Sequence, residues 1–156
     1  MSPRHAPSTT SIQLFVPAPR TTYAVDIAAH LSHARLENVL RTNTMTALND
    51  GAKDEAISLG ASVALMRYDA IRDPRTRKTH LAMDGFVESP SHPIWNTILP
   101  PDGFQCRCST SVIGWASAER LGLAKDGHLL QGSIDKRNAP KWELINTGKF
   151  PDPSFK

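Results

Sequence analysis

A change in hydrophobic period near residue 60 constrains the fold of this 156-residue chain more than any other feature. Before that point, apolar residues recur close to every 3.6 positions, the spacing that places them on one face of a helix. The pattern predicts a long helix over residues 27–51, with Asp26 as its N-cap and Gly51 as its end. A second, shorter helix is predicted over residues 52–60.

After residue 60, short segments replace the helical pattern. Residues 62–68 and 105–113 are apolar or alternating and indicate strands, and residues 114–124 are typical of a short helix. Asp84-Gly85 predicts a tight turn, because glycine tolerates a positive φ. Helices followed by short antiparallel strands predict an α+β fold, with a long N-terminal helix and a short helix packed on a small sheet.

The 12 prolines cluster at both ends of the chain and in one central stretch, where they mark loops and arms. We therefore predict a Pro-rich N-terminal arm over residues 1–22, a folded domain over residues 23–124 and an irregular C-terminal arm over residues 125–156. The chain has no run of about 18 apolar residues, so no membrane span is expected.

The chain is mildly basic, with a formal charge of +3 and a pI of about 9.1, which permits a nucleic-acid partner without assigning one. The candidate contacts to nucleic acid or to a protein partner are Arg72, Arg75, Arg77, Lys78 and Arg107. Acidic residues are interleaved with these cations, so a solvated network of ion pairs is the alternative interpretation. Its acidic members would be Asp69, Asp73, Asp84 and Glu88.

Cys106 and Cys108 are the two cysteines of the chain. In a strand, residues two apart have their Cα atoms roughly 6.5 Å apart, at the edge of the range that a disulfide can bridge. Their side chains point to the same face of the strand. The pair therefore suits a shared ligand, or two thiols that face the core as small hydrophobic groups.

A metal site is the sharper of these two interpretations. His80, Cys106 and Cys108 supply three ligands that zinc accepts, and Asp73 is the candidate for the fourth, with Asp84 and His92 as substitutes. A small domain with proline-rich loops would gain stability from such an ion. This hypothesis requires the arginine-rich loop that carries His80 to fold back against the segment that bears the thiols.

Three motif blocks occur in order along the chain. They are Arg41-Thr42-Asn43 in the predicted helix, the stretch from Asp73 to Gly85 with its Arg-Thr-Arg, His80 and Asp-Gly, and the stretch from Pro100 to Cys108. Over residues 27–113 the series resembles the phage head morphogenesis domain of the Mu F-like minor head protein family. Each block alone is weak, but three in order are fairly specific.

The resemblance implies a minor, capsid-associated head protein of a bacteriophage that acts in head morphogenesis and DNA packaging and is structural rather than catalytic. The implied partners are the portal protein or the major capsid protein, with packaged DNA as a further contact and no membrane or small-molecule substrate. The implied location is the virion head, and the host cytoplasm during assembly.

A small metal-dependent hydrolase or nuclease, of a toxin-like kind, is the alternative function, and it would use His80, Cys106 and Cys108. The glycines stand singly, so neither a P-loop nor a dinucleotide-binding pattern occurs in the sequence. Carboxylates for Mg²⁺ are few and lie in a segment rich in arginine. We therefore predict that the chain is not an enzyme.

Overall fold

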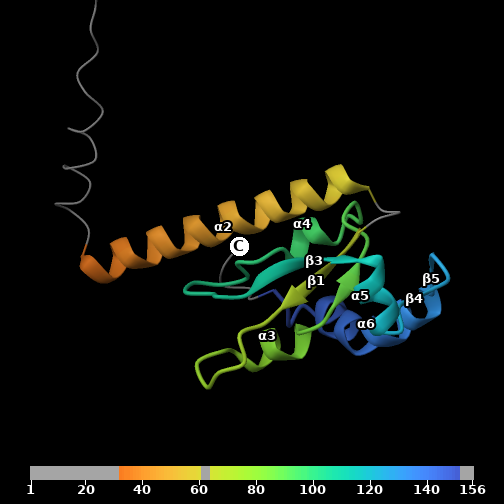
Figure 1. Cartoon of the computed structure of the whole chain (residues 1–156). Helices are drawn as coiled ribbons and strands as arrows, with labels where there is room; N and C mark the ends of the chain where they lie inside the picture. The colour runs from red at the N-terminus through yellow and green to blue at the C-terminus, as the bar shows by residue number, and fades with distance from the viewer. Residues whose placement is uncertain (1–31, 61–63, 152–156) are drawn as a thin grey trace, which may run out of the picture. The chain divides into compact units, whose positions relative to one another are not determined.

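The computed structural model describes residues 32–60 and 64–151 and has an α+β fold, as the sequence predicts (Figure 1). Its elements follow in the order α2 (His33–Leu59), β1 (Ala64–Asp69), α3 (Lys78–Met83), β2 (Val87–Glu88), α4 (Trp95–Ile98), β3 (Ser109–Gly114), α5 (Trp115–Arg120), β4 (Ala124–Lys125), β5 (His128–Leu129) and α6 (Gln131–Asn146). None of the helices in these residues is both long enough and apolar enough to cross a membrane.

The central sheet has three antiparallel strands in the order β2-β1-β3. Side chains alternate along β1, so Met66 and Tyr68 face one side of the sheet and Leu65 faces the other. Met66 and Tyr68 belong to a buried cluster that also contains Trp95, whereas Leu65 packs in a second cluster with Ile113. The sheet therefore separates two apolar cores.

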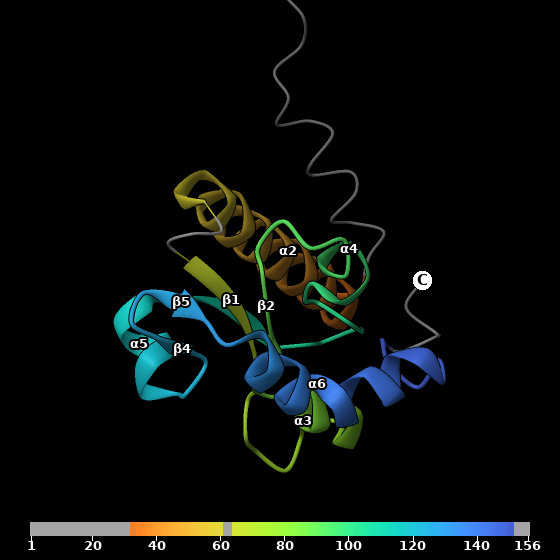
Figure 2. The same cartoon turned by 90° about the vertical axis from the view of Figure 1, so that its right-hand side faces the viewer.

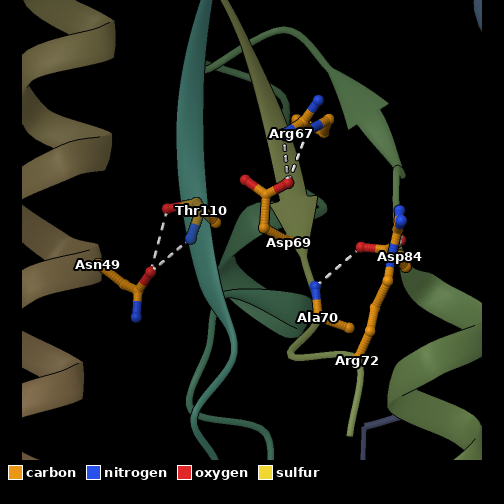
Figure 3. Close-up of polar contacts among 7 residues, drawn as sticks. All are labelled: Asn49, Arg67, Asp69, Ala70, Arg72, Asp84 and Thr110. Atoms are coloured by element: carbon orange, nitrogen blue, oxygen red, sulfur yellow. Dashed lines mark hydrogen bonds and ion pairs between the residues drawn. The ribbon is translucent and has the colours of Figure 1, made fainter.

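Asparagine side chains from two helices cover the two edges of this sheet. On the β3 edge, Asn49 of α2 accepts hydrogen bonds from the backbone N–H of Thr110 at 2.7 Å and from its hydroxyl at 3.1 Å (Figure 3). On the β2 edge, Asn138 of α6 accepts from the N–H of Val87 at 3.1 Å and donates to its carbonyl at 2.6 Å. These bonds satisfy backbone groups that an edge strand would otherwise leave unpaired.

The break predicted at Gly51 is absent, because α2 runs through this residue as one helix of 27 residues. A glycine inside a helix costs about 1 kcal/mol relative to alanine. Contacts on both sides of Gly51 hold the helix: Asn49 is bonded to Thr110, and Ala56 is fully buried in the core. The predicted start of this helix lies outside the described residues.

The irregular C-terminal arm was a wrong prediction for residues 128–146. The short β4–β5 hairpin leads into α6, which packs beside β2 (Figure 2). Its Ile134 and Asn138 are buried, and Trp142 and Ile145 pack against the core, so residues three or four apart form one inward face. The predicted N-terminal arm lies outside the described residues.

The loops around the candidate site are also more ordered than predicted. α3 begins at Lys78, inside the segment expected to be a loop, and α4 lies within the proline-rich stretch that follows it. The Asp84-Gly85 turn is confirmed, with Gly85 at φ +74°. The predicted strand over residues 105–113 begins only at Ser109, so both cysteines precede it.

Candidate metal centre

His80 reaches the core from the short helix α3. Within this helix, His80 and Met83 are the buried residues, and their three-residue spacing turns both toward the sheet. The side chain of His80 is 2 % exposed. A buried histidine has two ring nitrogens that need partners, so its surroundings decide what it can do.

The cysteines come from the loop that leads into β3. A turn closed by the bond from the Cys106 N–H to the Gly103 carbonyl at 3.1 Å shapes this loop, and both thiols point into the core. Cys106 is 4 % exposed and Cys108 is 2 % exposed. The two-residue spacing thus turns both sulfurs inward, as the sequence predicts, although they precede the strand.

The three side chains meet at one point. The Nδ1 atom of His80 lies 3.6 Å from the Sγ atom of Cys106 and 3.6 Å from that of Cys108. The three ligand atoms all lie within 4.8 Å of one another, which is close enough for them to hold one metal ion. The Nε2 atom of His80 is buried without a hydrogen-bond partner in the described residues.

The electrostatics of this cluster favour one thiolate. A hydrogen bond from Cys106, together with one from His80, lowers the pKa of the Cys108 thiol well below its usual value. The pKa of the Cys106 thiol is raised, first by its hydrogen bond to Cys108 and then by burial. The lowered pKa of Cys108 favours its thiolate, which is the form of cysteine that binds metals.

Three residues that the sequence analysis did not assign to the metal site surround the cluster. The hydroxyl of Tyr68 donates to Asp102 at 2.7 Å, and burial together with this carboxylate raises the pKa of the tyrosine. The ring of Phe150 packs edge-on against His80 and Tyr68, at centroid distances of 5.4 and 5.8 Å. The C-terminal segment therefore closes the core over the cluster.

The structure does not bring Asp73 to this cluster. Both carboxylate oxygens of Asp73 accept hydrogen bonds from Arg107 at 2.7 Å, and this ion pair is the main reason that the pKa of Asp73 lies below its ordinary value. The two substitutes also lie elsewhere: Asp84 accepts from the N–H of Ala70 and from Arg72 (Figure 3), and His92 accepts from the N–H of Ile94.

Of the five residues predicted to contact nucleic acid or a protein partner, some form ion pairs and some line a pocket. Arg72 bonds to Asp84, with an N–O distance of 2.6 Å, and Arg107 bonds to Asp73, so part of the expected network is present. Arg75 is 79 % exposed and lies 3.7 Å from Asp73. Arg75, Arg77 and Arg107 line one pocket, whereas Lys78 begins α3 as an exposed residue.

The comparison with known protein families places the chain among bacteriophage proteins. The family model for phage Mu protein F like proteins matches residues 20–111, which is more than half of the chain. The chain therefore belongs to the phage Mu F-like protein family, as the sequence analysis predicts.

Two curated relatives agree with this assignment. The chain is 33 % identical over 101 residues to the Mu-like prophage FluMu F protein of Haemophilus influenzae, an alignment that covers 63 % of this chain and 24 % of that protein. It is 30 % identical over 92 residues to the putative capsid assembly protein F of Escherichia phage Mu, with coverage of 59 % and 21 %. The alignments thus span about a quarter of these relatives. No solved structure matches the chain.

Proposed function

We propose that this chain is an architectural domain of a phage head protein, and that zinc bound by His80, Cys106 and Cys108 stabilises its core. The observation that carries the zinc part is the meeting of three buried ligand atoms from two segments of the chain. Membership of the phage Mu F-like family carries the head-assembly part.

The names of the relatives support the proposed role in the phage head. One relative is described as a putative capsid assembly protein, which supports a role in head morphogenesis. We further propose that the chain acts as a minor head component during DNA packaging. Its partners would be the portal protein or the major capsid protein, together with packaged DNA. Its location would be the virion head, and the host cytoplasm during assembly.

The geometry of the cluster fits zinc. In a tetrahedral site with bonds of about 2.3 Å to sulfur and about 2.0 Å to nitrogen, the nitrogen and sulfur atoms lie roughly 3.5 Å apart. Both distances from the His80 nitrogen to the sulfurs are 3.6 Å. A single nitrogen equally far from two sulfurs has only one hydrogen or one lone pair to share, whereas an ion between them would bind all three atoms.

Burial favours a structural ion over a catalytic one. A catalytic zinc needs a fourth coordination position that substrate can reach, whereas the three side chains here are at most 4 % exposed. The alternative nuclease would need free carboxylates for Mg²⁺. Instead, Asp69, Asp73 and Asp84 each accept bonds from an arginine. These observations support an architectural role rather than hydrolysis.

Titration of the purified chain with Co²⁺ tests the zinc part of the proposal. A Co²⁺ ion bound to two cysteines and a histidine in tetrahedral geometry gives intense visible bands and a sulfur-to-metal charge-transfer band. His80→Asn should abolish these bands, whereas His128→Asn, which alters an exposed histidine, should retain them. Octahedral Co²⁺ spectra in the unaltered chain, or equal spectra for both variants, would contradict the proposal.

Mass spectrometry of purified phage heads tests the assembly part. We expect peptides of this chain in intact heads, at a small copy number relative to the major capsid protein. The His80→Asn variant should fold poorly and should therefore be depleted from these particles, whereas the His128→Asn variant should be retained. Heads that contain no peptide of the chain would overturn this part and leave the zinc result unaffected.

A further inference from the structure

The metal centre leaves one feature of the sequence motifs unexplained, because each of the three blocks contributes an arginine that lies outside the cluster. Arg41 comes from the first block on α2, Arg75 and Arg77 come from the second, and Arg107 lies between the two cysteines of the third. These four arginines line a single pocket of about 240 Å³, together with Phe104 and Gln105. Segments far apart in the sequence thus bring their guanidinium groups to one place.

The charged residues that line this pocket are all arginines. Arg41 pairs with Glu37 at 2.9 Å, and Arg107 pairs with Asp73. Arg75 is 79 % exposed and approaches Asp73 only to 3.7 Å. Arg75 is the arginine best placed to take a ligand, because its side chain is mostly exposed and its ion pair with Asp73 is long. A guanidinium has five N–H donors, so Arg75 can bond to a ligand in the pocket while it stays near Asp73.

An aromatic ring lies at the rim of the same pocket. Phe104 is 53 % exposed, although a phenyl ring of this size is usually buried, and its carbonyl accepts a bond from Arg77 at 3.3 Å. The next residue, Gln105, has a φ of +59°, a left-handed conformation that is strained for a non-glycine residue. Such strain is commonly found at binding sites.

We propose that this pocket binds a nucleotide unit, with its phosphate on the arginines and its base against Phe104. Guanidinium groups match phosphate oxygens with paired hydrogen bonds, and an aromatic ring offers a stacking surface to any base. A base can reach Phe104 only if it is unpaired, so the pocket favours a single strand or a free nucleotide over a duplex. An acidic peptide would use the arginines but not the ring.

Fluorescence anisotropy with a short labelled oligothymidylate tests this proposal on the full chain. Arg75→Gln should weaken binding roughly tenfold, because it removes a charge-assisted contact. The logarithmic salt dependence should become shallower by about 0.7. Phe104→Leu keeps an apolar side chain but removes the ring, and it should weaken binding roughly fivefold. The matched control Arg120→Gln removes an exposed charge on α5 and should change affinity by about twofold at most.

Competition identifies the source of the phosphate. If ATP displaces the labelled oligonucleotide at concentrations close to those needed of unlabelled oligonucleotide, the pocket is a free-nucleotide site. If the oligonucleotide binds much more tightly than ATP, the pocket is a nucleic-acid site. Both results support the proposal. Thermal melting confirms that each variant folds. Failure to bind the oligonucleotide and ATP, equal weakening by Arg75→Gln and Arg120→Gln, or binding of poly-glutamate alone would overturn the proposal.

Discussion

Replacing Asn138 with leucine should destabilise the protein strongly, because this side chain holds α6 against the edge of the sheet. It is fully buried and makes two hydrogen bonds to the backbone of Val87, which is fully buried as well. Leucine has a similar volume but cannot bond, so it leaves one N–H and one carbonyl buried without partners. Each unsatisfied group costs about 1–3 kcal/mol, so we expect a loss of roughly 3 kcal/mol in the free energy of unfolding.

Urea denaturation measures this loss. With a slope of about 2 kcal/mol per molar urea, the midpoint of Asn138→Leu should fall by roughly 1.5 M while the slope stays unchanged. The matched control is Asn146→Leu, which alters an exposed asparagine of the same helix and should change the free energy by about 0.5 kcal/mol or less. A similar small loss in both variants would refute the reasoning, since Asn138 would then not hold the edge of the sheet.

Three further variants probe other contacts. Asn49→Ala should cost about 1–2 kcal/mol in urea denaturation, because Thr110 at the opposite sheet edge loses its acceptor. Phe150→Ala should cost about 3–5 kcal/mol and lower the urea midpoint more than Asn49→Ala does, because it empties the space beside the candidate metal centre. Asp73→Asn should remove a part of the stability that depends on pH, because Arg107 lowers the pKa of Asp73 in the folded state. The stabilisation from this ion pair is present above the ordinary carboxyl pKa and is lost as the pH falls through the lowered folded-state pKa.

Each of these variants has its own control or contrary result. Asn43→Ala on the exposed side of α2 should be nearly neutral, and a loss equal to that of Asn49→Ala would count against the edge contact. Retention of full stability in Phe150→Ala would mean that the C-terminal segment does not close the core. For Asp73→Asn, the melting temperatures of the variant and the unaltered chain are measured as a function of pH. A difference between these melting temperatures that does not shrink in acid would refute the ion-pair argument.

Local patterns predicted the parts of the fold that depend on neighbours in the sequence. The 3.6-residue period predicted α2, and the short apolar segment after residue 60 predicted β1. Helix α6 was missed in the sequence analysis, although its inward residues, including Asn138, lie three and four positions apart. Pro140 and the polar composition of this segment argue against a helix, and packing against β2 stabilises it nevertheless.

At the candidate site, too, the sequence predicted some of the contacts and not others. The motif blocks and the two-residue spacing of the thiols predicted that His80, Cys106 and Cys108 belong together, and the structure places them within reach of one ion. The contacts around the cluster join segments that lie far apart in the sequence: Asp102 of the third block bonds to Tyr68 of β1, and Phe150 arrives from beyond α6. Such contacts depend on the tertiary fold, so no spacing in the sequence could have predicted them.

The zinc content of the purified chain tests the central claim most directly. Elemental analysis after extensive dialysis should find about one zinc ion per chain, and a value near zero in the Cys106→Ser, Cys108→Ser double variant. Removing the ion with a chelator should lower the melting temperature of the unaltered chain and leave that of the double variant unchanged. Zinc-free protein that neither takes up added zinc nor changes its melting temperature would contradict the account.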